Sequence, residues 1–238
     1  MWKRRLIFLC LVLLTALPCT HSDGAILAGA PAAIPAETKY IALTFDDGPR
    51  KSTTTKLLDG LRERGASATF FLVGEQIEVN RELVERMKAE GHQVGNHTWS
   101  HAKLEGADAG TVAWEIKKTN DLLVSILGEG TYWLRPPYGR IQEAQKKQIT
   151  VPMVTWSIDS RDWESLNAAK AAQSVLQEAH PNAIILMHDI YPTSVEAALK
   201  IVDVLQKEGY VFVTVEELLA LNGIKPQLGV IYRSGDPL

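Results

Sequence analysis

Cysteine is almost absent from this chain of 238 residues. The two cysteines are Cys10 and Cys19, and both lie in or beside an N-terminal leader. The folded domain is therefore expected to have no thiol, which excludes disulfides and cysteine-ligated zinc. Any metal ion in that domain must be bound by His, Asp or Glu side chains.

Apolar runs long enough to span a membrane are also missing. The apolar stretch from Leu6 to Leu17 is shorter than the roughly 20 residues needed to cross a bilayer, and it follows the basic segment Lys3-Arg4-Arg5. This order is typical of an export signal. We predict a signal peptide at residues 1–22 and a protein exported to the cell exterior, the cell wall or the periplasm, with no membrane span after cleavage.

The cleavage point stays open, because Thr20-His21-Ser22 and Ala28-Gly29-Ala30 both offer small residues. Cys19 raises the alternative of a lipid anchor, but Pro18 stands where that motif needs a small residue. Residues 23–38 are rich in Ala, Gly and Pro, which is typical of a linker.

Excess positive charge is absent as well. The whole chain has 25 basic and 28 acidic residues, and removing Lys3, Arg4 and Arg5 leaves 22 basic residues against those 28. This balance argues against a nucleic-acid partner. With 46% apolar residues and no internal repeat, we expect one globular domain at residues 39–221, followed by a C-terminal tail at residues 222–238, and a monomer.

What the domain does contain is a regular alternation of β-rich and helical segments. About seven β/α units predict an α/β fold with a largely parallel sheet, either open or closed into a barrel. The expected strands are Tyr40–Phe45, Ala68–Val73, Gln93–His97, Tyr132–Arg135, Met153–Ile158, Ala183–His188 and Val211–Val215. The expected helices are Ser52–Arg64, Asn80–Glu90, Thr111–Leu127, Asn167–Ala179 and Thr193–Lys207, with Ser52 and Asn80 as N-terminal caps.

Polar side chains gather where the predicted strands end. Asp46 and Asp47 follow the first strand, His97 and His101 lie at the end of the third, and further polar residues end or follow the later strands: Arg135, Asp162 and His188. In parallel α/β folds, sites are built at the carboxyl ends of the strands. We therefore expect these side chains to meet on one rim.

Asp46 and Asp47 form an unusual end for an apolar strand. Adjacent side chains on an extended segment diverge, so two carboxylates with separate roles would explain the pair better than the Asp-Gly-Pro turn alone. Two imidazoles four residues apart, at His97 and His101, suit one metal ion if the segment turns helically. With Asp47 they give a His₂Asp ligand set for one divalent ion. Zinc suits this set best, and Co²⁺, Fe²⁺, Mn²⁺ and Ni²⁺ also bind such ligands.

A hydrolytic metal site also needs a base and an acid. Such an ion lowers the pKa of bound water to about 7, so that hydroxide forms at neutral pH. Asp46, beside the ligand Asp47, is the candidate base, and His188 is the candidate acid. Asp162 is placed to pair with His188, and Arg135 is placed to pair with Asp46.

These segments resemble a known family. The stretches 44–49 (TFDDGP), 97–101 (HTWSH), 135–139 (RPPYG), 159–163 (DSRDW) and 186–188 (LMH) look like the five ordered motifs of the polysaccharide deacetylases, carbohydrate esterase family four. The resemblance runs from Lys39 to Leu221. It implies a distorted (β/α)₇ barrel in a single domain, a metal ion bound by Asp47, His97 and His101, Asp46 as base and His188 as acid.

The same resemblance implies further roles. Arg135 would orient Asp46, Asp162 would tune His188, and the backbone N–H of Tyr138 would help to bind an oxyanion. Substrate contacts would come from Tyr138, Pro137, Trp163 and Leu186, with Trp163 and Leu186 forming a pocket for the acetyl methyl group. Among Trp99, Trp133, Trp156 and Trp163 we expect most in the core, with Trp163 in the site and Trp99 as a weaker candidate.

The expected substrate is a glycan that contains N-acetylglucosamine. An export signal favours a wall glycan, so we predict deacetylation of peptidoglycan with release of acetate. Alternatives with the same chemistry are chitin oligomers, acetyl-xylan esters or a small cyclic amide. A non-catalytic glycan-binding module on the same fold is a different class of function; it would be favoured if Asp46 or His188 were replaced, and both are present.

Overall fold

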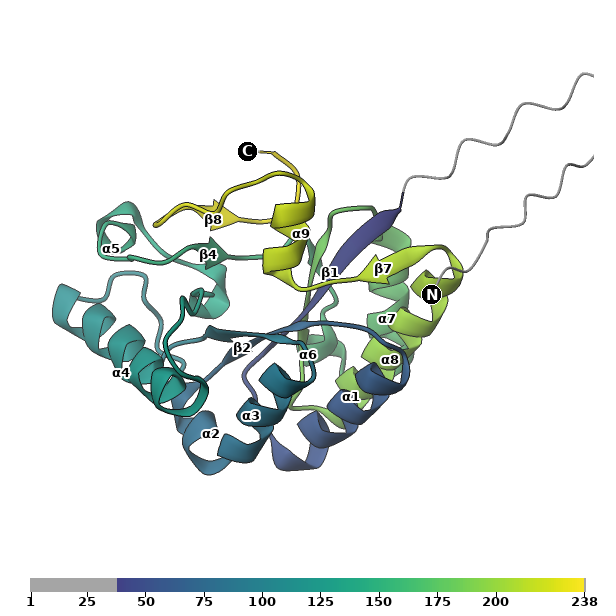
Figure 1. The fold of residues 1–238 in the computed structure, drawn as a ribbon, viewed down its shortest axis with the longest axis horizontal. Coiled ribbons are helices and arrows are strands. Elements are labelled where there is room, and N and C mark those ends of the chain that lie inside the picture. Colours follow the sequence, from purple (N-terminus) through teal and green to yellow (C-terminus); the bar gives the residue numbers. More distant parts are fainter. Residues whose placement is uncertain (1–37, 238) are drawn as a thin grey trace, which may run out of the picture. The chain divides into compact units, whose positions relative to one another are not determined.

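The structure is a computed structural model that describes residues 38–237. The predicted signal peptide and nearly all of the predicted linker lie outside the described residues. Strands and helices alternate along the chain (Figure 1). The strands are β1 (Lys39–Asp46), β2 (Thr69–Leu72), β3 (Gln93–Asn96), β4 (Met153–Val154), β5 (Ile158–Asp159), β6 (Ile184–His188), β7 (Tyr210–Phe212) and β8 (Ile231–Tyr232).

The paired strands of the sheet all run parallel to one another. Its central order is β3-β2-β1-β6-β5, with β7 paired to the start of β1. Single bridges from Asn96 to Leu134 and from Leu134 to Met153 continue the ladder to β4, which pairs with β8. Within residues 38–237 no strand pair joins β5 to β8, but a single antiparallel bridge joins Ser234, after β8, to Ala183, before β6. The predicted single-domain α/β fold with a largely parallel sheet is confirmed.

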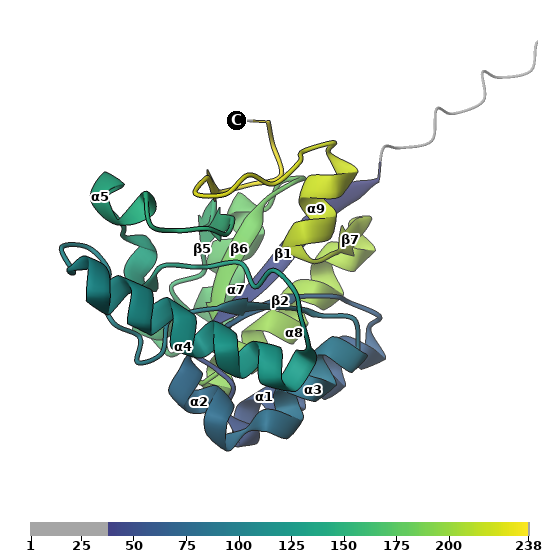
Figure 2. The same cartoon turned by 60° about the vertical axis from the view of Figure 1, so that its left-hand side comes forward.

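Helices cover the outside of this sheet (Figures 1 and 2). Neighbouring helices touch in the order α7, α8, α1, α3, α4, as expected for the outer layer of a β/α barrel. The helices are α1 (Lys51–Glu63), α2 (Gly74–Val79), α3 (Arg81–Ala89), α4 (Ala109–Leu127), α5 (Glu143–Lys146), α6 (Asp162–Ser165), α7 (Ala168–Glu178), α8 (Pro192–Lys207) and α9 (Val215–Leu221), with a 3₁₀ turn, η1, at Pro137–Gly139. No helix among residues 38–237 is both long and apolar enough to cross a membrane.

Strand β1 shows how the sequence separates the core from the site. Ile41, Leu43 and Phe45 alternate along the strand and pack into the main hydrophobic core between the sheet and the helices. The intervening residues Thr44 and Asp46 are also buried, but they meet polar partners instead. One face of β1 therefore stabilises the fold, and the other face builds the site.

The structure differs from the expected elements in several places. The predicted strand Met153–Ile158 is split into β4 and β5, and the predicted strand Tyr132–Arg135 is only a bridge at Leu134. Helices α2, α5, α6 and α9 were not expected. The segment expected as a C-terminal tail contains β8, whose Tyr232 is buried.

Of the two predicted helix caps, Ser52 is wrong, and Asn80 is at the predicted N-cap position without the capping hydrogen bond. Helix α1 is preceded by Arg50 rather than capped by Ser52. Asn80 does precede α3 but accepts no capping hydrogen bond there. Its amide donates to the carbonyl oxygens of Pro49 and Gln76 at 3.1 and 2.9 Å. Asn80 therefore ties α2 to the loop that follows β1.

Candidate active site and metal centre

A cleft of about 690 Å³ lies where the parallel strands end. Asp46 and His188 are opposite each other in the register of β1 and β6, so both face the cleft from neighbouring strands. The predicted site residues that line it are Asp46, Asp47, His97, His101, Tyr138, Trp163, Leu186 and His188; Arg135, Pro137 and Asp162 lie behind this lining. The expected convergence on one rim is therefore present.

Asp47, His97 and His101 form a compact cluster of metal-ligand atoms, all within 4.8 Å of one another. Asp47 Oδ1 lies 3.5 Å from His97 Nε2 and 3.3 Å from His101 Nε2. His97 Nδ1 is 2.7 Å from the Arg135 carbonyl oxygen, which can only accept, so Nδ1 carries the proton and Nε2 offers its lone pair to the cluster. Burial lowers the pKa of His97 and keeps its imidazole neutral, as a metal ligand must be.

The two histidines meet through a loop and not through a helix turn. Thr98 and His101 have left-handed backbone conformations, with φ of 67° and 58°. The buried Glu115 of α4 fixes this loop: its Oε2 accepts the N–H groups of Trp99 and Ser100 at 2.8 and 2.9 Å. The premise of a helical turn was therefore wrong, although the pairing of the imidazoles is present.

Glu115 was not among the predicted site residues, although its position in the sequence indicates a buried contact. It lies on the buried face of α4 with Val112, Thr119 and Leu123, at helical spacing. A carboxylate on the apolar face of a helix needs a buried partner. That pattern alone predicts a polar contact beneath this helix.

Asp46 is fixed by a buried arginine. Arg135 Nη1 donates to Asp46 Oδ1 at 2.8 Å and to Thr44 Oγ1 at 2.7 Å, and its Nη2 donates to the Thr155 carbonyl oxygen at 2.8 Å. Arg135 has no exposed surface and Asp46 only 3%. Burial lowers the pKa of Arg135, while Asp46 opposes that shift. This pairing leaves Asp46 Oδ2 facing His97 Nε2 at 3.7 Å.

The neighbouring acids do not diverge as strand geometry predicts. Asp47 has φ of 72°, which ends β1 and turns its carboxylate toward the same imidazole that Asp46 faces. Asp189 packs directly against this turn, since a Cβ at Gly48 would overlap its carboxylate. Thr54 donates a hydrogen bond to the same carboxylate. Burial raises the pKa of Asp189 to about 7. Glycine is therefore required after Asp47.

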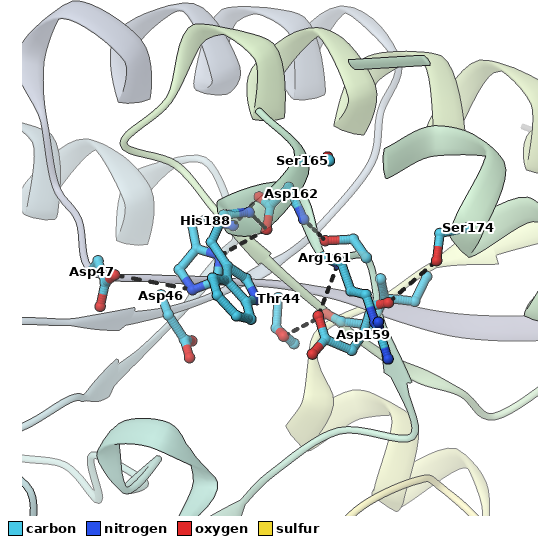
Figure 3. Close-up of polar contacts among 12 residues, drawn as sticks. Thr44, Asp46, Asp47, Asp159, Arg161, Asp162, Ser165, Ser174 and His188 are labelled. Carbon is cyan, nitrogen blue, oxygen red and sulfur yellow. Dashed lines mark hydrogen bonds and ion pairs between the residues drawn. The ribbon is translucent and has the colours of Figure 1, made fainter. Parts of the chain in front are cut away.

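His188 lies between Asp47 and Asp162, as Figure 3 shows. Its Nδ1 lies 2.8 Å from Asp162 Oδ1, and its backbone N–H donates to Asp162 Oδ2 at 2.8 Å. Its Nε2 is 4.0 Å from Asp47 Oδ2, on the cleft side. Burial disfavours the imidazolium, but the hydrogen bond and charge of Asp162, with the charges of Asp46 and Asp47, outweigh it and raise the pKa of His188 to about 9. A protonated Nε2 is therefore available to the cleft at neutral pH.

This pair predicts a pH effect for Asp162→Asn. Removing the carboxylate leaves the burial of His188 less opposed, so the pKa of His188 should fall by about two units or more. Because an acid must be protonated to act, the alkaline limb of kcat/KM against pH should move to lower pH by a similar amount. Activity near pH 8 should fall more than activity near pH 6. An alkaline limb at its original pH would show that Asp162 does not control this histidine.

The predicted substrate-contact residues occupy different walls of the cleft. Trp163 and Tyr138 are half-exposed or more, at 50% and 60%, whereas Leu186 is buried at the cleft floor and Pro137 is buried in η1. Tyr138 has a left-handed backbone, with φ of 61°. Its ring packs edge-on against His101. The backbone of Tyr138 is thus held beside a candidate metal ligand.

Two tryptophans are arranged differently from the expectation. Trp156 was expected in the core but lines the cleft. Trp99, the weaker candidate, is buried against Gly74 and Thr119, with Lys118 Nζ 3.6 Å from its ring centre.

The residues present fit one divalent ion. Asp47 Oδ1 is buried and accepts no hydrogen bond within residues 38–237, although it lies between two imidazole nitrogens. A buried carboxylate oxygen without a donor is costly unless a cation satisfies it. The ligand set of two imidazoles and one carboxylate leaves positions open for water and substrate.

Comparison with known proteins agrees with this geometry. The sequence model of the polysaccharide deacetylase family matches residues 33–151. The chain is 40% identical over 194 residues to the peptidoglycan-N-acetylglucosamine deacetylase PgdA of Listeria monocytogenes, covering 82% of this chain and 41% of that protein. It is 39% identical over 180 residues to the peptidoglycan-N-acetylmuramic acid deacetylase PdaC of Bacillus subtilis, covering 76% and 38%. The chain thus spans about two fifths of the length of these relatives.

Solved structures show the same fold. The structure of PdaC superposes with a TM-score of 0.76 and 37% identity, over 78% of this chain and 92% of that one. A family 4 acetyl xylan esterase from Clostridium thermocellum, in complex with a cobalt ion, superposes with a TM-score of 0.79 and 31% identity, over 84% and 100%. Sequence, fold and cleft therefore agree, and the chain belongs to the polysaccharide deacetylase family.

Proposed function

We propose that this chain is a metal-dependent hydrolase that removes N-acetyl groups from N-acetylglucosamine units of peptidoglycan and releases acetate. One observation carries the proposal: a carboxylate and a protonated histidine, Asp46 and His188, flank the Asp47-His97-His101 cluster from neighbouring strands. The catalytic domain would occupy residues 39–221, with β8 adding to its sheet from the segment beyond.

The metal ligands would be Asp47, His97 and His101. A divalent ion bound there supplies Lewis-acid chemistry, because it polarises a carbonyl group and lowers the pKa of water. We propose zinc, since two imidazoles and a carboxylate suit it; the cobalt in the related esterase supports Co²⁺ as a substitute.

The proton transfers follow from the two buried pairs. Asp46 takes a proton from the attacking water through Oδ2, while Arg135 holds Oδ1 and fixes the direction of the carboxylate. Water adds to the amide carbon and gives a tetrahedral oxyanion, to which the Tyr138 backbone N–H donates. His188 then gives its Nε2 proton to the amide nitrogen, the C–N bond breaks, and acetate and a free amine result. Asp162 stabilises the imidazolium before that step.

The walls of the cleft would position the sugar. We propose that Trp163 and Leu186 enclose the acetyl methyl group and that Tyr138 borders the sugar ring, with the predicted contact residue Pro137 supporting Tyr138 from behind the lining. Trp156 offers a second aromatic face, and aromatic rings commonly stack on sugars. These contacts select an N-acetyl sugar by shape and apolar surface.

Two observations support peptidoglycan as the glycan. The relatives named above act on peptidoglycan, according to their names. The basic and apolar leader supports export to the wall, where this polymer lies. Extracellular action by a monomer is part of the proposal.

An acetyl-xylan esterase is the second candidate. The Clostridium thermocellum esterase shares the fold over its whole length, and the proposed proton transfers serve an ester as well as an amide. A non-catalytic glycan-binding module is disfavoured, because both Asp46 and His188 are present and paired.

The deciding experiment compares three substrates. Acetate release would be measured side by side from peptidoglycan, N-acetylglucosamine oligomers and acetyl-xylan with the metal-loaded protein. We expect the highest kcat/KM on peptidoglycan. Faster release from acetyl-xylan than from either N-acetyl substrate would contradict the proposal and favour the esterase.

A further inference from the structure

Two cations line the cleft on the side of His101 and Tyr138. They are Lys103, in the loop after His101, and Arg140, directly after η1. Neither is part of the acid, base or ligand set described above. The acidic residues of the cleft lining are Asp46, Asp47 and Asp159, and all three lie outside this cationic wall.

Arg140 has no counter-charge of its own. Its side chain is exposed and forms no ion pair within residues 38–237. Lys103 Nζ pairs with Glu105 Oε2 at 2.9 Å. The hydrogen bond from Lys103 and then its charge lower the pKa of Glu105, and the charge of Arg140 adds to this, so the three groups lie near one another. Two cations against one carboxylate leave one positive charge in excess on this wall.

The backbone that carries Arg140 is firmly placed. Its N–H donates to the Pro137 carbonyl oxygen at 3.3 Å. Gly139 packs so closely on Trp156 that a Cβ there would lie 2.8 Å from the indole ring. Since these contacts hold the turn, the backbone of Arg140 is fixed beside the cleft, and its side chain starts from a defined position.

An unpaired arginine here has a simple electrostatic consequence. The excess of acidic residues in the whole chain repels an anionic substrate. A cation at the mouth offsets this repulsion locally and offers a planar fork that matches a carboxylate. A surface arginine that serves only hydration would not need to border the cleft.

We propose that Arg140, assisted by Lys103, binds a carboxylate on a sugar next to the one that is deacetylated, and so selects acidic over neutral glycans. This inference rests on the proposed function and names the substrate class more narrowly. N-acetylmuramic acid, the sugar in the name of the related PdaC, carries such a group where no peptide is attached to its lactyl side chain.

The test uses one glycan with and without its charge. Soluble peptidoglycan strands freed of their stem peptides would be compared with the same strands after their muramic acid carboxylates are converted to amides, and kcat/KM for acetate release measured on both. For Arg140→Ala we expect the ratio of acidic to amidated substrate to fall about fivefold, mainly through KM, the size expected for an exposed charge pair. Arg140→Lys should keep part of the ratio. Raising the salt concentration should lower the ratio in the parent protein but not in Arg140→Ala.

Arg233 provides the matched control. It is an exposed arginine after β8 that does not border the cleft. Arg233→Ala should leave the ratio unchanged. An unchanged ratio in Arg140→Ala, or an equal loss on both substrates, overturns the inference while leaving the proposed function standing. A parent protein that releases no acetate from either substrate overturns the proposed function, and this inference with it.

Discussion

Asp46→Asn should abolish acetate release while the protein keeps its divalent ion. The substitution removes the group that takes a proton from water, and general-base catalysis contributes about 10²- to 10⁴-fold, so kcat should fall about a thousandfold. The ligand atoms of Asp47, His97 and His101 are unchanged, so metal content measured on the purified protein should stay near one ion per chain. Loss of acetate release with the metal content unchanged distinguishes a catalytic base from a metal ligand.

Folding must be checked in the same variant, because Asp46 is the counter-charge of the fully buried Arg135. Asparagine keeps an oxygen that accepts the Arg135 N–H but loses the charge. Breaking a buried pair costs about 3 to 5 kcal/mol when one partner is removed, and the retained hydrogen bond should make the loss smaller here. Thermal unfolding measures it. Near-full activity in a folded Asp46→Asn protein would show that the base assignment is wrong.

His101→Ala should lose both the ion and the activity. It removes one of the three ligand side chains and leaves Asp47 and His97 in place. Loss of groups that merely orient a ligand lowers metal affinity about 10- to 100-fold, so loss of a ligand should lower it by about a hundredfold or more. Acetate release should fall to background at metal concentrations that saturate the parent protein.

His180→Ala is the matched control for that variant. His180 is an exposed histidine at the opposite end of the domain from the cleft lining, where its Nδ1 lies 2.8 Å from the Pro181 carbonyl oxygen. It should bind metal and release acetate as the parent protein does. If His101→Ala bound the ion with parent affinity, as measured by metal titration, the ligand set would be wrong.

Much of this site could be predicted from the sequence, because its residues lie at or directly after the ends of predicted strands. The alternation of Ile41, Leu43 and Phe45 with polar residues predicts where β1 ends, and parallel strands bring their carboxyl ends to one rim. That rule alone predicts that Asp46, His97 and His188 lie close together. The pairing of Asp46 with Arg135 and of His188 with Asp162 follows from opposite charge. The distances within these pairs do not follow from the sequence.

What the sequence did not predict depends on loops. The left-handed backbone at Asp47 and His101 redirects their side chains in a way that strand or helix periodicity cannot express. Glu115 acts across the fold on the loop between the histidines, and only its place on an apolar helix face hints at this. Trp156 lines the cleft from the segment between β4 and β5, and local propensity does not reveal that this segment interrupts the strand.

The most direct test of the central claim is acetate release from peptidoglycan before and after removal of the metal. The protein would be treated with a chelator, dialysed, assayed, and assayed again after one equivalent of Zn²⁺ or Co²⁺ is added. We predict that release falls to background without the ion, returns with it, and is matched mole for mole by new glucosamine amines. Full activity in the metal-free protein, or no acetate from peptidoglycan in the metal-loaded protein, would contradict the account.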